Sequence, residues 1–413
     1  MTGIINKDRL LIIILLVMMH KCFDLFAMTD NFFGIQYSDI LFLYSTFFIV
    51  YYYMKYPKHY FSGRFSKIIF LIPILIILSA LMAKLFYNQN FILGILTQRA
   101  WLITMFLYFP FRALIVKGKL TLDIFWKILY LVVGIEASIY LMQYIVGADH
   151  YFLKVPYTYR YESIRIVADM AFMHLILMHA VSEILKKVNL KKNIFFLVLI
   201  LMYVFLVNKG RGEVIICLIL IAGIILLNKA SHLYKTAIIV AALLLGFNFI
   251  MQSTAVGEFT SILLGDSKDP TYDVRERSQE FYIEKLNANP LAWIYGYGMQ
   301  NTTLVSSQEE TGINQGYLIT DNGIYGFLFS YGIFGLVWYI YSLSAQLRDG
   351  WILFKKKRES IVIVKILKDI IFFATNIGFF YSYQSLYSVL FFILIELFSK
   401  DIKSARSISE GQR

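Results

Sequence analysis

The sequence predicts an all-α polytopic membrane protein with about twelve transmembrane helices and one long outer loop, periplasmic or extracellular, between spans nine and ten. Apolar residues make up 59 % of the 413 residues and charged residues only 16 %, against roughly 45–50 % and about 25 % in soluble domains. The apolar residues form long runs, of which the clearest are Leu10–Met19, Ile68–Met82, Ile194–Val207, Val214–Leu227 and Ala237–Met251. Several approach the roughly 20 residues that cross a bilayer as a helix, whereas a β-barrel would show short alternating segments. An ordinary soluble enzyme is excluded.

Twelve spans follow from these runs and from the weaker ones between them. Their predicted limits are 9–27, 37–54, 66–84, 100–116, 124–146, 164–185, 193–208, 212–228, 234–251, 322–344, 360–380 and 383–399. They divide the chain into residues 1–251 with the first nine spans, a long outer loop at 252–321, and residues 322–413 with the last three spans and a tail.

The basic residues predict the orientation of these spans. With a cytoplasmic N-terminus, the short inner segments and the tail carry 24 lysines and arginines, and the short outer segments with their adjoining span ends carry 8. Since short cytoplasmic loops are enriched in these residues, we expect both termini in the cytoplasm and the protein in the cytoplasmic membrane. The net charge of +12 then reflects topology and indicates no nucleic-acid partner.

Nucleotide and metal chemistry are not indicated. The chain lacks a Gly-x-x-x-x-Gly-Lys-Ser/Thr phosphate loop and a Gly-x-Gly-x-x-Gly turn, the motifs that cradle nucleotide phosphates. It shows no obvious set of metal ligands, and no cofactor is expected. Any chemistry should therefore take place in the membrane or on its outer face.

The outer loop contains one clear helical signal. Asp273 can cap a helix with Glu276 in the capping-box position, and the helix should stop at Asn289–Pro290 because the residue before proline disfavours helix. At helical spacing, Arg275 falls on the apolar side, toward the membrane or the core. Arg277 falls off that side, beside two glutamates, as a solvated ion-pair residue would.

Two further arginines lie at predicted outer span ends. Arg211 lies in a hairpin, Asn208-Lys209-Gly210-Arg211-Gly212, between two strongly apolar spans, and Arg165 opens the sixth span. Glycines free the backbone for a tight turn and let a ligand approach closely. The alternative is that Lys209 and Arg211 cap the spans at the lipid headgroups and that Arg165 snorkels. Together with the loop arginine, however, they form a pattern suited to phosphate, which guanidinium groups bind bidentately.

These motifs resemble those of the Wzy polymerase and O-antigen ligase superfamily of bacterial envelope polysaccharide enzymes. The hairpin Asn208–Gly212 resembles the family's Ser-Arg-Gly hairpin. The segment from Arg275 through Phe281 and Asn289-Pro290 to Gly296-Tyr297-Gly298 resembles its arginine–aromatic–proline–Gly-x-Gly pattern. Thr320-Asp321-Asn322-Gly323 resembles its His-Asn or Asp-Asn box. The matched region covers about residues 200–345. The spacing of Phe281 leaves open whether Arg275 or Arg277 is the family's loop arginine.

The resemblance implies a membrane glycosyltransferase that uses a lipid-diphosphate donor. It would polymerise undecaprenyl-diphosphate-linked repeat units into O-antigen, capsule or exopolysaccharide, with a chain-length regulator and a flippase as further candidate partners. The implied catalytic residues are Arg211 and Arg275, which would neutralise the leaving diphosphate, and Asp321, which would be the general base or orient the attacking hydroxyl. Asn322 would position sugar hydroxyls, and Gly296 and Gly298 would let the loop approach the substrate. The full set of implied substrate-binding residues is Arg165, Gly210, Gly212, Arg277, Gly296, Tyr297, Gly298 and Asn322. Capping of the tenth span is the alternative role of Asp321.

Two other functions stay open. A ligase would move finished glycan onto an acceptor, but such ligases usually carry histidine where this chain has Asp321. A flippase or secondary transporter would also fit twelve spans. Transporters tend to carry internal repeats and ionisable residues deep in their spans, whereas here we expect few buried charges, Asp169 being one.

Overall fold

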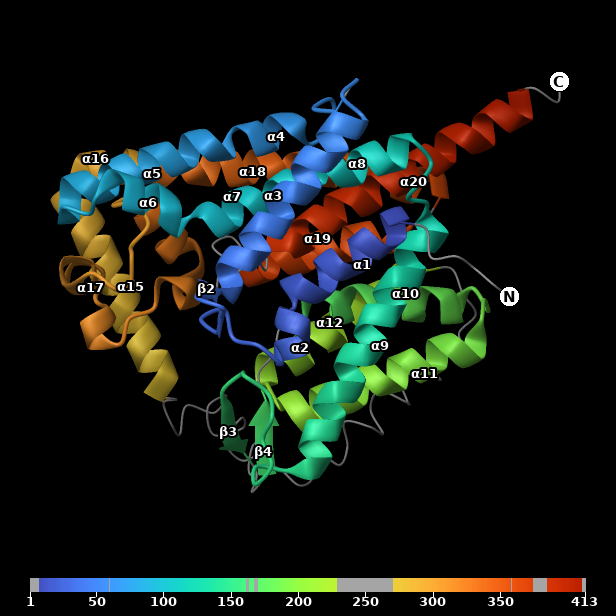
Figure 1. Ribbon diagram of the computed structural model, residues 1–413, viewed down its shortest axis with the longest axis horizontal. Coiled ribbons are helices and arrows are strands. Elements are labelled where there is room, and N and C mark those ends of the chain that lie inside the picture. Colours follow the sequence, from blue (N-terminus) through green and yellow to red (C-terminus); the bar gives the residue numbers. More distant parts are fainter. Residues whose placement is uncertain are drawn as a thin grey trace.

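The protein is built almost entirely of helices, as predicted (Figure 1). The computed structural model describes residues 7–58, 60–160, 163–166, 170–228, 270–357, 359–373 and 385–410. The only strands in these residues form two small antiparallel hairpins, β1 (Asn31–Phe32) with β2 (Ile35–Gln36) and β3 (Tyr157–Arg160) with β4 (Ser163–Ile166).

The helices fall into three stretches along the chain. The first contains α1 (Lys7–Met19), α2 (Lys21–Asp24), α3 (Tyr37–Lys55), α4 (Ser66–Phe70), α5 (Ile72–Tyr87), α6 (Phe91–Thr97), α7 (Arg99–Phe106), α8 (Tyr108–Val116) and α9 (Leu122–Val146). The second contains α10 (Ala171–Leu185), α11 (Leu190–Met202), the π-helix η1 (Tyr203–Asn208) and α12 (Arg211–Leu227). The third contains α15 (Pro270–Ala288), α16 (Pro290–Tyr295), α17 (Val305–Thr311), the 3₁₀ turns η2 (Ile313–Gln315) and η3 (Ile319–Asn322), α18 (Gly323–Lys357), α19 (Ser360–Phe373) and α20 (Leu386–Glu410).

Five helical segments are long and apolar enough to cross a membrane. They are Ser66–Tyr87, Arg99–Val116, Leu122–Val146, Leu190–Asn208 and Ile319–Lys356, and shorter apolar helices cover Ala171–Leu185 and Gly212–Leu227. Large apolar side chains on their outward faces, such as Leu85, Ile145 and Val337, are exposed, which soluble proteins rarely allow over wide areas. The multi-pass character is therefore supported by the fold, while the count of twelve stays a prediction. The predicted span 234–251 and the segment 374–384 lie outside the described residues.

Two predicted spans differ from the structure at one end each, the end that the sequence predicts to be the outer one. The first helix stops at Met19, and Lys21–Asp24 form a turn with φ between +50° and +65°. The prediction of helix from residue 164 is wrong, because Ser163–Ile166 is a strand and α10 begins at Ala171. The sequence Ser-Ile-Arg-Ile alternates polar with β-branched residues, which is the pattern of a strand. Arg165 therefore lies in a hairpin ahead of α10, the helix of the sixth predicted span.

The ends of the bundle carry different elements. In Figure 1 the start of α1, the end of α20 and the turn between α10 and α11 lie toward the right, whereas α15, α16 and α17 lie at the left. The start of α1 and the end of α20 thus lie toward the same end of the bundle, as the predicted even number of spans requires. That this side is the cytoplasmic one is a prediction from the basic residues.

Residues 270–322, which the sequence predicts to belong to the outer loop, are called the outer segment below. They pack on neighbouring helices through a small core of their own. This core contains Ala83 and Tyr87 of α5, Tyr282 and Leu286 of α15, Ala292, Tyr297, Ile319 and Phe329. The predicted helix is confirmed as α15, and it ends before Asn289, whose side chain accepts a hydrogen bond from the Leu291 amide and begins α16. Asp273 lies within the first turn of α15 rather than at its cap, because the helix starts three residues earlier, at Pro270.

Candidate functional site

The glycine hairpin is presented by an irregular helix end. Helix α11 continues into the π-helix η1, a form that recurs at functional sites, and α12 begins at Arg211. Lys209, rather than a glycine, takes the left-handed conformation of the turn, with φ +51°. The Gly210 amide donates to Oδ1 of Asn208 over 2.9 Å. The turn is therefore held closed by its own asparagine.

Arg165 and Lys209 fasten this hairpin to the β3–β4 hairpin by reciprocal hydrogen bonds. Arg165 Nε donates to the carbonyl of Asn208 over 2.9 Å, and Lys209 Nζ donates to the carbonyl of Ile164 over 3.1 Å. The Lys209 side chain also lies 5.0 Å from the centre of the Tyr144 ring and is only 4 % exposed. Burial lowers the pKa of Lys209 to about 8. Two predicted cation sites, Arg165 and the hairpin, thus come together.

The two hairpin glycines have different surroundings. A Cβ on Gly210 would meet Asn208 Oδ1 at 2.5 Å, and it would lie 3.5 Å from both Arg165 Nη2 and Glu213 Cγ. A Cβ on Gly212 would have nothing within 4 Å. Gly210 is therefore required by the turn, while Gly212 leaves open space at the N-terminus of α12. The side chain of Arg211 lies outside the described part of the structure.

A histidine–glutamate pair adjoins this hairpin and was not singled out from the sequence. Glu213, in the first turn of α12, places Oε2 3.1 Å from Nε2 of His174 in α10. His174 is buried, whereas the Glu213 side chain is 31 % exposed. Ionisable residues within or at the ends of spans are candidate functional residues by default, so the sequence could have drawn attention to His174 and to Glu213 separately. Their pairing could not be predicted from the sequence, because it depends on the packing of α10 against α12.

A second group of predicted residues lies on the outer segment. Ser278 Oγ of α15 donates to Oδ1 of Asn322 over 2.6 Å, and Asn322 Nδ2 donates to the carbonyl of Leu318 over 2.7 Å. Asn322 is 1 % exposed. The oxygen of the Asn322 amide thus holds α15 on η3 and its nitrogen closes the η3 turn. That Asn322 positions sugar hydroxyls stays a prediction.

Asp321 is only partly buried and stays a candidate base. Thr320 Oγ1 lies 3.4 Å from one of its carboxylate oxygens. Burial, together with the nearby Tyr317 and Asp321, raises the pKa of the Tyr282 phenol well above its usual value. The carboxylate of Asp321 is thus close to the buried face of α15.

The two loop arginines are both exposed. Arg275 does not point toward the core, since the buried face of α15 begins one turn later, at Ser278; the alternative that it points toward the membrane stays a prediction. Arg277 is solvated as expected, but its Nε donates to the carbonyl of Asp273 over 3.2 Å. The part of the chain that the structure describes holds no ion pair between Arg277 and Glu280 or Glu284. Burial therefore does not distinguish Arg275 from Arg277.

The Gly-Tyr-Gly motif packs against protein. A Cβ on Gly296 would lie 2.5 Å from the Ser330 carbonyl carbon, and one on Gly298 would lie 2.2 Å from the Ser79 carbonyl oxygen. The Tyr297 ring stacks on Phe329 at 4.9 Å and its hydroxyl donates to the Lys285 carbonyl over 2.8 Å. In the structure these glycines let the loop approach α5 and α18. Their role in approaching a substrate stays a prediction.

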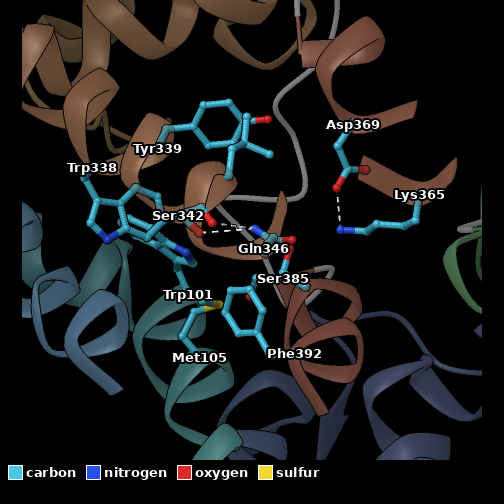
Figure 2. Close-up of a pocket in the computed structure, with 12 residues that line it drawn as sticks. Trp101, Met105, Trp338, Tyr339, Ser342, Gln346, Lys365, Asp369, Ser385 and Phe392 are labelled. Atoms are coloured by element: carbon cyan, nitrogen blue, oxygen red, sulfur yellow. Dashed lines mark hydrogen bonds and ion pairs between the residues drawn. The ribbon is translucent and has the colours of Figure 1, made fainter. Parts of the chain in front are cut away.

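Buried charge is more frequent than predicted. Lys365 and Asp369 of α19 form an ion pair beside a cavity lined by α7, α18, α19 and α20, where Gln346 Nε2 lies 3.3 Å from the carbonyl of Ser342 (Figure 2). Lys365 is 2 % exposed and Asp369 8 %. The expectation of few buried charges is wrong, because ion pairs within one helix, such as Lys365–Asp369, and between helices, such as His174–Glu213, satisfy buried charges that hydropathy does not register. Asp169 lies outside the described residues.

No cluster of three or more histidine, cysteine, aspartate or glutamate side chains suited to a metal ion occurs among the residues that the structure describes. Comparison of the chain with protein-family models and with curated protein sequences gives no match. The family resemblance therefore stays a prediction from the short motifs.

Proposed function

We propose that the protein is a polymerase of undecaprenyl-diphosphate-linked oligosaccharide repeat units, acting on the outer face of the cytoplasmic membrane. The observation that carries the proposal is the meeting of Arg165 and the buried Lys209 at a glycine hairpin. Both cations lie at the N-terminus of a 17-residue helix, α12, where backbone N–H groups and the helix dipole favour anions. A Cβ on Gly212 would have nothing within 4 Å, so the backbone at the start of this helix is open to approach.

In this proposal the hairpin holds the leaving group of a glycosyl transfer. A hydroxyl of one repeat unit attacks the anomeric carbon of another, and the diphosphate departs with the electron pair of the broken bond. Arg165, Lys209 and Arg211 stabilise the negative charge that develops on it, which is the usual electrostatic contribution to a lower barrier. Arg275 on α15 is a further candidate for this clamp.

Deleting the gene distinguishes the candidate functions. For a polymerase, single repeat units are still attached to their final acceptor while long chains disappear. Accumulation of long lipid-linked chains would instead identify a ligase, and retention of single lipid-linked units on the cytoplasmic face would identify a transporter.

Complementation of the deletion then tests the clamp. A charge-assisted hydrogen bond is worth about 1.5–3 kcal/mol, so Arg165→Ala should slow chain growth by roughly 10- to 150-fold. Arg348→Ala is the matched control, since this arginine is exposed on α18 and pairs with its neighbour Asp349. Membrane abundance of each variant is measured alongside, and normal chains from Arg165→Ala would refute the clamp.

Transport is the second candidate, and the buried Lys365–Asp369 pair favours it. Intramembrane ion pairs beside a cavity mark ion and proton routes in many transporters. The cavity has about 20 Å³ open to the centres of water molecules, enough for roughly one water. A polymerase needs no such pair for chemistry. Normal chain growth in Lys365→Met with intact protein levels would therefore remove the support for transport.

A further inference from the structure

The Glu213 carboxylate has one fixed and one accessible side. Oε2 is buried against Nε2 of His174, while the side chain as a whole is 31 % exposed. This leaves Oε1 as the oxygen that a bound molecule can reach. The partner His174 is itself 4 % exposed and lies in the first turn of α10, on its buried face.

This carboxylate faces the same space as the cations. Glu213 Cγ and Arg165 Nη2 each lie 3.5 Å from the point where a Cβ on Gly210 would be. That point lies within the turn, 2.5 Å from Asn208 Oδ1, so the two distances show only that a cation suited to a leaving phosphate and a carboxylate suited to accept a proton lie close to one another beside the hairpin. A displacement at carbon needs these two groups near a single reacting centre.

His174 is placed to orient this carboxylate. Nε2 of His174 lies 3.1 Å from Oε2 of Glu213, so the buried ring limits the positions that the carboxylate can take, and a protonated ring would form an ion pair with it. The relation is that of a base held by a third group, as in the common catalytic triads. Other titratable or charged groups that face Glu213 come from its own helix and from neighbouring elements: Cys217 of α12, Lys368 of α19, Tyr203 of η1 and Arg165 of β4.

We propose that Glu213, oriented by His174, is the general base of the transfer; the proposal rests on the polymerase function above. The acceptor oxygen forms the new bond to the anomeric carbon, and the bond from that carbon to the diphosphate oxygen breaks. The acceptor proton passes to Oε1 of Glu213 and then to water on the outer side. Glu213 is then the catalytic residue and His174 a positioning residue, and Glu213 takes the role that the sequence suggested for Asp321.

The test compares chain growth with donor binding in the full-length protein in membranes. Because a general base contributes about 10²–10⁴-fold, Glu213→Gln should lower the rate of chain growth by about that factor. Its affinity for undecaprenyl diphosphate, the probe for binding, should stay within about threefold of the native value, because the cations are unchanged. The control is Glu183→Gln, the same change at the other end of α10, where the glutamate pairs with Lys186 over 3.3 Å; it should behave as the native protein.

A pH profile separates catalysis from packing. The rate of chain growth should fall at low pH, where the base is protonated. This fall should be absent from the residual activity of Glu213→Gln, and in His174→Asn it should occur at a different pH. A histidine that only supports the fold would not move it. If Glu213→Gln does not reach the membrane, the shift in His174→Asn decides the question, and a fall at an unchanged pH overturns the proposal.

Other outcomes separate this proposal from the function on which it rests. Native chain growth in Glu213→Gln, or its loss together with diphosphate binding, overturns the base and leaves the polymerase standing. Loss of rate with retained binding in Asp321→Asn, but not in Glu213→Gln, assigns the base to Asp321. Absence of chain growth in the native protein supplied with lipid-linked repeat units overturns both proposals.

Discussion

Lys209 should make diphosphate binding at the hairpin fall as pH rises. Its pKa is lowered to about 8 by burial, against about 10.4 for an exposed lysine. About nine-tenths of the molecules carry the Lys209 charge at pH 7 and about one-tenth at pH 9. If the diphosphate binds the charged form, its affinity should drop about tenfold between these pH values. Undecaprenyl diphosphate is esterified at one end only, and its terminal phosphate loses its last proton at about pH 6. Any remaining titration above pH 7 adds negative charge to the ligand and cannot explain weaker binding to cations.

Stability should change in the opposite direction. The pKa of Lys209 is lower in the folded protein than in the unfolded chain, so unfolding takes up a proton between about pH 8 and about pH 10.4. The folded state is therefore stabilised as pH rises through this window. The opposite signs exclude general alkaline unfolding as the reason for weaker binding.

The assay measures the affinity of the purified, membrane-embedded protein for undecaprenyl diphosphate at pH 7 and pH 9, with the unfolding temperature at both. Lys209→Arg is the matched variant, because guanidinium stays charged and can still donate to the Ile164 carbonyl. Its affinity should be the same at both pH values. An equal drop in Lys209→Arg, or no drop in the native protein, would refute the reasoning.

Three further predictions concern the outer segment. A reporter fused at Ser306 should be found on the outer side of the membrane; a cytoplasmic signal would place the proposed site on the wrong face. Gly298→Ala should lower the free energy of unfolding by about 2–5 kcal/mol, because the new Cβ overpacks against α5 and because φ is left-handed, at +90°. The control Gly316→Ala, with φ +80° and open space around the Cβ, should lower it by only about 1–2 kcal/mol. Equal unfolding temperatures of the two variants would contradict this. Arg275→Ala should slow chain growth by roughly 10- to 150-fold and Arg277→Ala by less, because Arg277 already bonds to its own helix; the reverse order of chain lengths would make Arg277 the loop arginine.

Local signals in the sequence predicted the outer helix well. The proline after Asn289 and the apolar spacing of Tyr282 and Leu286 are properties of neighbouring residues, and the structure has the helix end and the buried face where they indicate. The start of α10 was predicted wrongly because the prediction used hydropathy averaged over a window. Such averaging hides the period-two pattern of Ser163–Ile166, which is the pattern of a strand.

Contacts between distant elements could not be predicted in this way. Glu213 and His174 are 39 positions apart, and only the packing of α10 on α12 brings them within 3.1 Å. Glycine roles are ambiguous for a related reason. A missing Cβ at Gly298 serves approach to a ligand or to a backbone equally well, and only the neighbouring helix decides which. Arg165 was predicted only to lie at the outer end of a span with the other arginines, and its bond to Asn208 could not be predicted because it depends on the β4 strand.

The docking of the outer segment limits how this protein can be re-engineered. Helix α18 bends at Gly332, with φ +62° and ψ −165°, and a Cβ there would lie 2.4 Å from the Ile294 carbonyl oxygen of α16. Together with Gly298 against α5, this contact makes the segment part of the membrane bundle rather than a detachable cover. Exchanging only residues 270–322 between polymerases to alter sugar choice should therefore yield misfolded chimeras. An exchange that carries the donor's α5 and α18 along with the segment would preserve the matched surfaces.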